Sequence, residues 1–191
     1  LYYCPQIWCS DNTDAIERLR IQYGTSFGYP MSSVSAHVSV CPNHQNHRVT
    51  PFKTRGICAM QGTFGYELDL SKMTDEEKKM AGEQIAFFKE HGRLFQFGDY
   101  YRLTSPFENR DYTVWEYAAQ DGSEACMSVV YTDMYANAAS EIVKWKGLDP
   151  KKVYQMQLDG EDAGNFSGAA LMHAGILLPL PKQNYDAFQI Y

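Results

Sequence analysis

Apolar and polar residues change their spacing several times along the first half of the chain. Residues 2–9 form a short run of aromatic and apolar side chains, which predicts a strand buried on both faces. A polar turn over residues 10–14 offers several helix caps, and from residue 15 to residue 24 the apolar residues recur at helical spacing. Those that share one predicted helix face are Ile16, Leu19 and Tyr23. A strand, a turn and a helix in this order make one unit of an α/β fold.

The same alternation continues toward residue 95. Residues 34–40 alternate in character and predict a second strand, and residues 64–70 form a further short apolar stretch. Thr74 and Glu77 have the spacing of a capping box, which predicts the start of a helix that ends at His91. These signals together favour an α/β layer or barrel for the first part of the chain.

The spacing of apolar residues is different after residue 95. Turn residues separate several strand-length runs, and no long helical period remains. The runs cover residues 100–103, 113–119, 125–132 and 153–158. This pattern predicts a small antiparallel β-sandwich. We therefore expect an α/β domain over residues 1–95 and an all-β domain over residues 96–191.

Composition and charge exclude several classes of partner. The chain has 191 residues and a net charge of −6, so nothing draws its surface to nucleic acid or to anionic lipid. No apolar run is long enough to cross a bilayer.

Aromatic residues make up 14% of the chain, with 14 Tyr and 10 Phe. Aromatic rings cover the apolar face of a pyranose in sugar-binding proteins, but large β-domains show the same excess.

The cysteines and the first residues bear on location and completeness. Five cysteines are an odd number without a framework spacing, which suits a reducing compartment and favours a cytoplasmic protein. The chain starts inside an apparent core strand, without Met and without a signal peptide. We therefore expect further residues upstream of Leu1.

Two carboxylates follow the first predicted strand. The carboxyl ends of strands form the catalytic face of an α/β barrel, so Asp11 is a candidate for chemistry. Spacing alone fits a turn or cap residue at Asp11 better. Asp14 is expected in the first helical turn, paired with Arg18 four residues later.

Residues with metal-ligand chemistry lie in the second predicted strand and in the polar loop that follows it. The residues with ligand chemistry are His37, Cys41, His44 and His47. Structural zinc sites usually begin from closely paired ligands, and this spacing is loose. We therefore expect no bound metal here. The chain also has no glycine-rich phosphate fingerprint, so we expect no nucleotide cofactor.

Several stretches together point to one family. Residues 2–18 contain the run Trp8-Cys9-Ser10-Asp11-Asn12-Thr13-Asp14, and this segment resembles the acid/base segment of glycoside hydrolase family 36. Further stretches match the same family, namely Ser35–Ser39, Pro42–Gln45, Thr54–Gly56 and Phe64–Asp69.

The resemblance implies the closing part of a (β/α)8 TIM barrel followed by a C-terminal antiparallel β-sandwich. It implies a retaining α-galactosidase that acts on terminal α-linked galactose in melibiose and raffinose-type sugars, without a cofactor. Asp11 would be the acid/base, Asp14 and Arg18 would support its turn, and Trp8 and Ser10 would bind substrate.

The nucleophile of that family lies in a Lys-Trp-Asp segment, which this chain lacks. We therefore expect the upstream part of the same enzyme to supply it. The resemblance also suggests a homo-oligomer, a tetramer. Two alternatives remain open at this stage: an α-N-acetylgalactosaminidase of the same family, and a non-catalytic carbohydrate-binding or assembly module.

Overall fold

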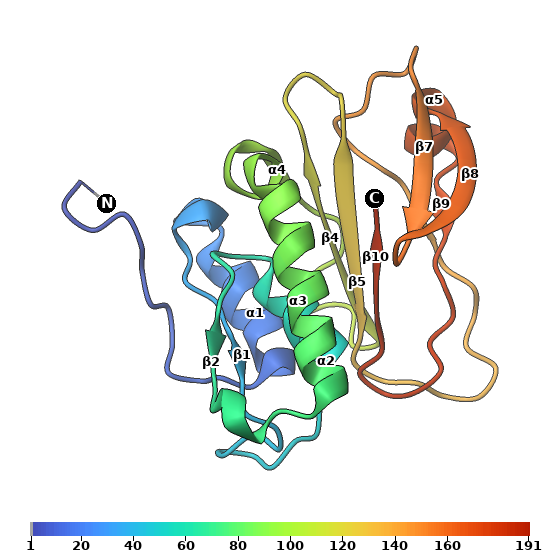
Figure 1. Cartoon of the computed structure of the whole chain (residues 1–191). Coiled ribbons are helices and arrows are strands. Elements are labelled where there is room, and N and C mark those ends of the chain that lie inside the picture. The colour runs from blue at the N-terminus through green and yellow to red at the C-terminus, as the bar shows by residue number, and fades with distance from the viewer. Residues whose placement is uncertain (1) are drawn as a thin grey trace. The chain divides into compact units, whose positions relative to one another are not determined.

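The computed structural model describes residues 2–191, and the chain divides into two compact units, Leu1–Gln96 and Phe97–Tyr191. Figure 1 shows the elements of both. None of the helices in the described part of the chain is long and apolar enough to cross a membrane.

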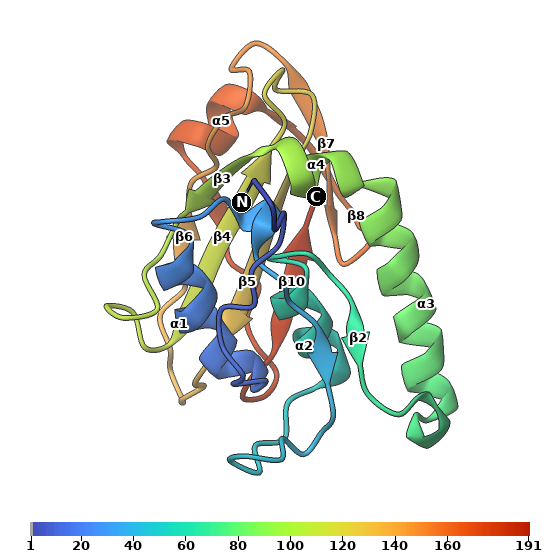
Figure 2. The ribbon, with the colours of Figure 1, turned by 90° about the vertical axis from the view of Figure 1, so that its left-hand side faces the viewer.

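The N-terminal unit alternates extended segments with helices. Its strands β1 and β2 pair in parallel, and two isolated parallel bridges join Ile7 to Val34 and Ser35 to Thr63. In Figure 1 the longer helices lie to one side of the β1–β2 pair, and Figure 2 shows β2 running between α2 and α3. The elements are α1 (Ala15–Thr25), β1 (Val38–Ser39), α2 (Phe52–Ala59), β2 (Tyr66–Glu67), α3 (Asp75–Glu90) and α4 (Gly92–Phe97), with 3₁₀ turns at Met31–Ser33 and Leu70–Lys72. The predicted alternation is present, while its closure into a barrel stays a prediction.

The predicted strand over residues 2–9 is wrong. Among the described residues this segment pairs only at Ile7, whose N–H donates to the carbonyl of Ser33 at 2.7 Å. Tyr2 is 92% exposed. An apolar run becomes a strand only where neighbouring backbone pairs with it, and one bridge is too little. The second predicted strand is shortened for the same reason to Val38–Ser39 and the bridges before it.

Local capping signals were more reliable than strand signals. Asp14 caps α1, and Thr74 with Glu77 forms the predicted capping box at the start of α3. The helix face of α1 is more polar than predicted, because Gln22 and Arg18 are buried beside its apolar residues. One core cluster of this unit consists of the buried residues Ala36, Val38, Phe52, Ala59 and Met73.

The C-terminal unit is built on a six-stranded antiparallel sheet in the order β3-β4-β5-β10-β7-β8. The strands are β3 (Asp99–Arg102), β4 (Tyr112–Ala118), β5 (Ala125–Tyr131), β7 (Val153–Leu158), β8 (Glu161–Ser167) and β10 (Ala187–Ile190). All four predicted runs are strands, whereas β8 and β10 were missed. No helix interrupts the described chain between β3 and β7.

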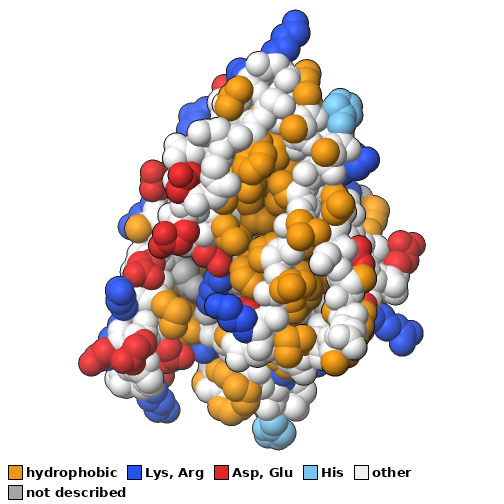
Figure 3. Space-filling view, turned by 90° about the vertical axis from the view of Figure 1, so that its right-hand side faces the viewer, with side chains coloured by type: hydrophobic (Ala, Val, Ile, Leu, Met, Phe, Trp, Pro, Cys, Tyr) orange, Lys and Arg blue, Asp and Glu red, His pale blue; other side chains and the backbone are white. Residues whose placement is uncertain are grey.

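The second layer of this unit is much smaller than the first. It consists of the antiparallel pair β6 (Ile142–Val143) and β9 (Ile176–Leu177), with the short helix α5 (Gly168–His173). The layers enclose a core that includes Val114, Met127, Val129, Trp145, Leu171 and Ile190. A pocket of about 180 Å³ opens beside this core, lined in part by Trp145 and Tyr154. Figure 3 shows apolar side chains gathered around a hollow on one face of the molecule.

Candidate active site

The segments that follow the parallel strands of the N-terminal unit meet at one end. Parallel pairing brings the carboxyl ends of neighbouring strands to the same edge. The segment after Ile7 and the loop 41–48 after β1 are accordingly in contact. Asn43 Nδ2 donates to Thr13 Oγ1 at 3.1 Å, and Gln45 Nε2 reaches the backbone oxygen of Asp11 at 3.4 Å.

Asp11 is exposed in this segment and has one oriented oxygen. Its Oδ1 accepts a hydrogen bond from Trp8 Nε1 at 2.8 Å. Among the residues that the structure describes, no group donates to its Oδ2. An exposed carboxyl group with one oxygen held and the other open can exchange a proton with a bound molecule.

Trp8 is held in place by two side chains. The ring of His37 stacks on the indole at 4.8 Å between centroids and 10° between planes. The guanidinium carbon of Arg18 lies 5.3 Å from the indole centroid, a cation–π distance. Trp8 is 45% exposed, so these contacts close only part of its surface.

His37 is a partly buried residue with one acidic neighbour. Its Nε2 lies 3.1 Å from Glu67 Oε2, but without the angle of a hydrogen bond. Burial lowers the pKa of His37; Glu67 opposes this effect and Arg18 reinforces it. The lowered pKa favours a neutral imidazole under the indole at neutral pH.

Arg18 does not pair with Asp14, which corrects the expected surface pair. It is buried and donates to the carbonyl oxygens of Ser10 at 3.1 Å and Ser35 at 2.7 Å, and to Gln22 Oε1 at 3.1 Å. Gln22 in turn donates to Gln61 Oε1 at 2.6 Å. Burial lowers the pKa of Arg18, against the opposing effect of the neighbouring Cys9 thiol. Arg18 therefore links the segment after Ile7 to the segment before β1, and it does not pair with a charge on its own helix.

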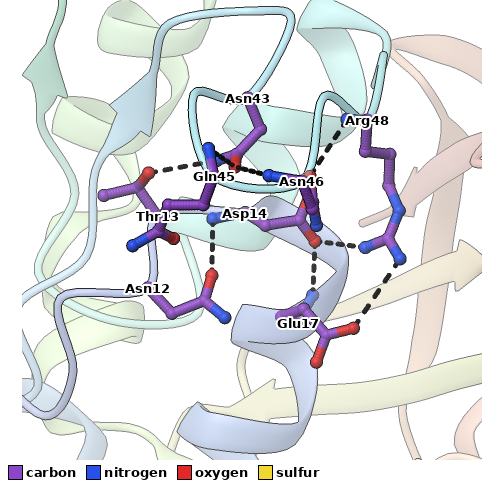
Figure 4. Close-up of polar contacts among 8 residues, drawn as sticks. All are labelled: Asn12, Thr13, Asp14, Glu17, Asn43, Gln45, Asn46 and Arg48. Carbon is purple, nitrogen blue, oxygen red and sulfur yellow. Dashed lines mark hydrogen bonds and ion pairs between the residues drawn. The ribbon is translucent and has the colours of Figure 1, made fainter.

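Asp14 is the buried N-cap of α1 and not a residue of its first turn. Its Oδ1 accepts the backbone N–H of Glu17 at 2.8 Å and also contacts Nη1 of Arg48 (Figure 4). Arg48 Nη2 lies 3.6 Å from Glu17 Oε1. The cap position directs the Asp14 side chain toward its own helix N-terminus, where Arg18, one turn later, cannot reach it.

The loop 41–48 is organised by Asn43. Its buried side chain accepts the backbone N–H groups of Gln45 at 2.9 Å and Asn46 at 3.2 Å (Figure 4). His44 and His47 are exposed on this loop. Within residues 2–191 no three side chains of His, Cys, Asp or Glu come together as a possible metal site.

The sequence missed the residues that reach the site from other segments. His37 was expected only as a possible metal ligand and as part of a stretch that resembles the family, Gln45 only as part of another such stretch, and no role was expected for Arg48. Ser10 has a structural contact: its Oγ accepts the backbone N–H of Asn12 at 3.1 Å. The substrate-binding role of Trp8 and Ser10 stays a prediction. The polar composition of residues 41–48 and the family resemblance over Pro42–Gln45 are the two signals that point to this loop.

Comparison with known proteins covers both units. Residues 1–98 match the family model "Melibiase", and residues 112–191 match "Glycosyl hydrolase family 36 C-terminal domain". The bifunctional alpha-galactosidase/sucrose kinase AgaSK of Mediterraneibacter gnavus is 51% identical over 99% of this chain and 20% of its own length. Alpha-galactosidase AgaA of Geobacillus stearothermophilus is 48% identical over 97% of this chain and 25% of its own length.

Solved structures agree with the sequence matches. The galactosidase domain of AgaSK superposes with a TM-score of 0.92 at 50% identity, covering 99% of this chain and 26% of that one. An AgaA variant in complex with raffinose gives 0.91 at 45% identity, covering 100% of this chain and 26% of that one. The chain thus spans about a fifth to a quarter of the length of these relatives. The matches over residues 1–98 and 112–191 show that this chain belongs to glycoside hydrolase family 36, the melibiases.

Proposed function

We propose that this chain is part of a retaining α-galactosidase and that Asp11 is its general acid/base. The observation that carries the proposal is the exposed Asp11 carboxyl group at the exit of the Ile7 segment, with Oδ1 bound by Trp8 and Oδ2 open. This end of the strands carries catalytic residues in barrel enzymes. Names of the relatives support the substrate class, since AgaSK and AgaA are alpha-galactosidases and AgaA has been solved with raffinose.

The proposed reaction needs two carboxylates. A nucleophile supplied from outside these residues attacks the anomeric carbon while Asp11 gives its proton to the departing glycosidic oxygen. Asp11, now ionised, then takes a proton from water, and that water releases galactose from the nucleophile with retained configuration. Asp14 is unsuited to the acid role because its carboxylate is buried against Arg48 and the helix N-terminus.

The wider setting is also part of the proposal. The parallel segments and helices of Leu1–Gln96 would close a (β/α)8 barrel, and Phe97–Tyr191 would be its C-terminal β-sandwich. The length of the relatives supports an upstream region that completes the barrel. Five free cysteines suit a cytoplasmic location, and the homo-oligomeric state rests on the resemblance alone.

Asp11→Asn in the complete enzyme tests the role. We expect kcat/KM for melibiose to fall by about 10²- to 10⁴-fold, because its sugar leaving group needs a proton. kcat/KM for an activated aryl α-galactoside should change little, and azide should restore its turnover by replacing the water that lacks a base.

Asp14→Asn is the matched control, since it removes a neighbouring carboxylate that caps α1. It should lower thermal stability and leave the dependence on leaving group unchanged. Equal losses for both substrates with Asp11→Asn, or the leaving-group effect appearing with Asp14→Asn instead, would contradict the assignment.

A further inference from the structure

We propose that Trp8 is the residue that positions the Asp11 carboxyl group for proton transfer, and that it does not act by binding the sugar. The inference rests on the proposed role of Asp11 and names how that residue is oriented. It replaces the substrate-binding role that the sequence suggested for Trp8.

The hydrogen bond between the two residues fixes where the acidic proton sits. Trp8 Nε1 can only donate, and it donates to Asp11 Oδ1 at 2.8 Å. An oxygen that accepts this bond is the poorer place for a proton, so the proton of the neutral acid resides on Oδ2. Because the indole N–H also limits rotation of the carboxyl group, Oδ2 keeps one direction toward the site.

The indole itself has little freedom to move. His37 stacks on it at 4.8 Å, and the Arg18 guanidinium lies 5.3 Å from its centroid. Arg18 is in turn fixed by hydrogen bonds to the carbonyl oxygens of Ser10 and Ser35 and to Gln22, so the contacts that hold the indole extend to two neighbouring segments. A positioning residue needs this support, because a loose donor would not orient the carboxyl group.

The charged and titratable groups around the indole fit a Trp8 side chain that only positions Asp11. Arg18 is cationic, His37 is partly buried with a lowered pKa, and Glu67 Oε2 lies 3.1 Å from His37 Nε2. The ring face that stacks on His37 is also closed to a pyranose, which would need an open aromatic face.

Trp8→Phe in the complete enzyme removes the N–H and keeps an aromatic ring over His37. We expect kcat/KM for melibiose to fall about tenfold, because the acid is present but less well oriented. kcat/KM for an activated aryl α-galactoside should stay within about twofold, since its glycosylation needs little protonation. A sugar-binding role predicts the opposite pattern, an equal loss for both substrates with a raised KM, because both carry the same galactose.

Two controls keep the test decisive. Trp145→Phe removes an indole N–H that has no hydrogen-bond partner in the C-terminal unit and should leave the ratio of the two substrates unchanged. Should Trp8→Phe disturb the loop, 3-benzothienylalanine at position 8 replaces only the N–H by sulfur and should give the same selective loss.

Asp11→Asn, measured beside these variants, separates the two ideas. A leaving-group effect with Asp11→Asn but none with either change at Trp8 overturns the positioning role alone. No leaving-group effect with Asp11→Asn overturns the proposed function, and the positioning role falls with it.

Discussion

Glu116 gives the C-terminal unit a stability that should depend strongly on pH. It lies in β4 with no exposed surface, opposite Met127 of β5. Its two carboxyl oxygens accept the backbone N–H of Lys146 at 3.2 and 3.0 Å. Burial raises the pKa of Glu116 from 4.5 to about 8, although the Lys146 hydrogen bond and charge lower it in part.

The sign follows from the raised pKa. Well below pH 4.5 the carboxyl group is protonated in both the folded and the unfolded chain, so its ionisation does not change the free energy of unfolding. Between 4.5 and about 8 the unfolded chain ionises while the folded one stays neutral, so stability falls as pH rises. At roughly 1.4 kcal/mol for each pH unit, the loss above pH 8 reaches at most about 5 kcal/mol.

Glu116→Gln keeps the shape of the neutral acid and cannot ionise. The free energy of unfolding of the variant minus that of the natural chain should therefore increase by about 4 kcal/mol between pH 5 and pH 9. Urea unfolding followed by tryptophan fluorescence measures it, because Trp115 and Trp145 are both buried in this unit. Glu161→Gln, on the exposed end of β8, controls for the loss of one negative charge. A difference that stays constant from pH 5 to pH 9 would refute the reasoning.

Two further changes test packing and charge by urea unfolding. Gly168→Ala should lower the free energy of unfolding by about 2 kcal/mol, because the new Cβ would lie 2.1 Å from the backbone oxygen of Asp149. Gly82→Ala in α3 should instead raise it by up to about 1 kcal/mol, because nothing lies within 4 Å of the new Cβ. Equal effects of the two changes would contradict the packing argument. Arg48→Met should cost about 2 kcal/mol by leaving the buried Asp14 without its cation, and Asp14→Asn added to it should recover part of that loss.

Features that depend on near neighbours in the chain could be predicted from the sequence. The capping box of Thr74 and Glu77 is complete in the structure, since its partners are three residues apart. The four predicted runs of the second half became strands because turn residues bound stretches of strand length and strand-forming composition. Family membership likewise rests on contiguous motifs, of which residues 2–18 were the most specific.

Strand identity was not fixed by apolar character alone. Residues 2–9 are apolar but have one backbone bridge among the described residues, whereas the polar strand β8 pairs with β7 along its length apart from one register shift between Met156 and Gln157. β10 lies between β5 and β7, which precede it by more than twenty residues. Pairing partners are set by the packed sheet, and a short window of sequence does not contain them.

The contact partners of the charged residues in the candidate site were likewise decided by the tertiary structure, because these partners lie far away in the chain. Local spacing predicted Asp14 with Arg18, but the fold brings in Arg48 from 34 residues away and turns Arg18 toward carbonyl oxygens. The neighbours of Trp8 and the burial of Glu116 are likewise long-range facts. The sequence determined the helix caps and the family, and the packing of distant segments decided what each side chain of the candidate site touches, because those contacts join residues far apart in the chain.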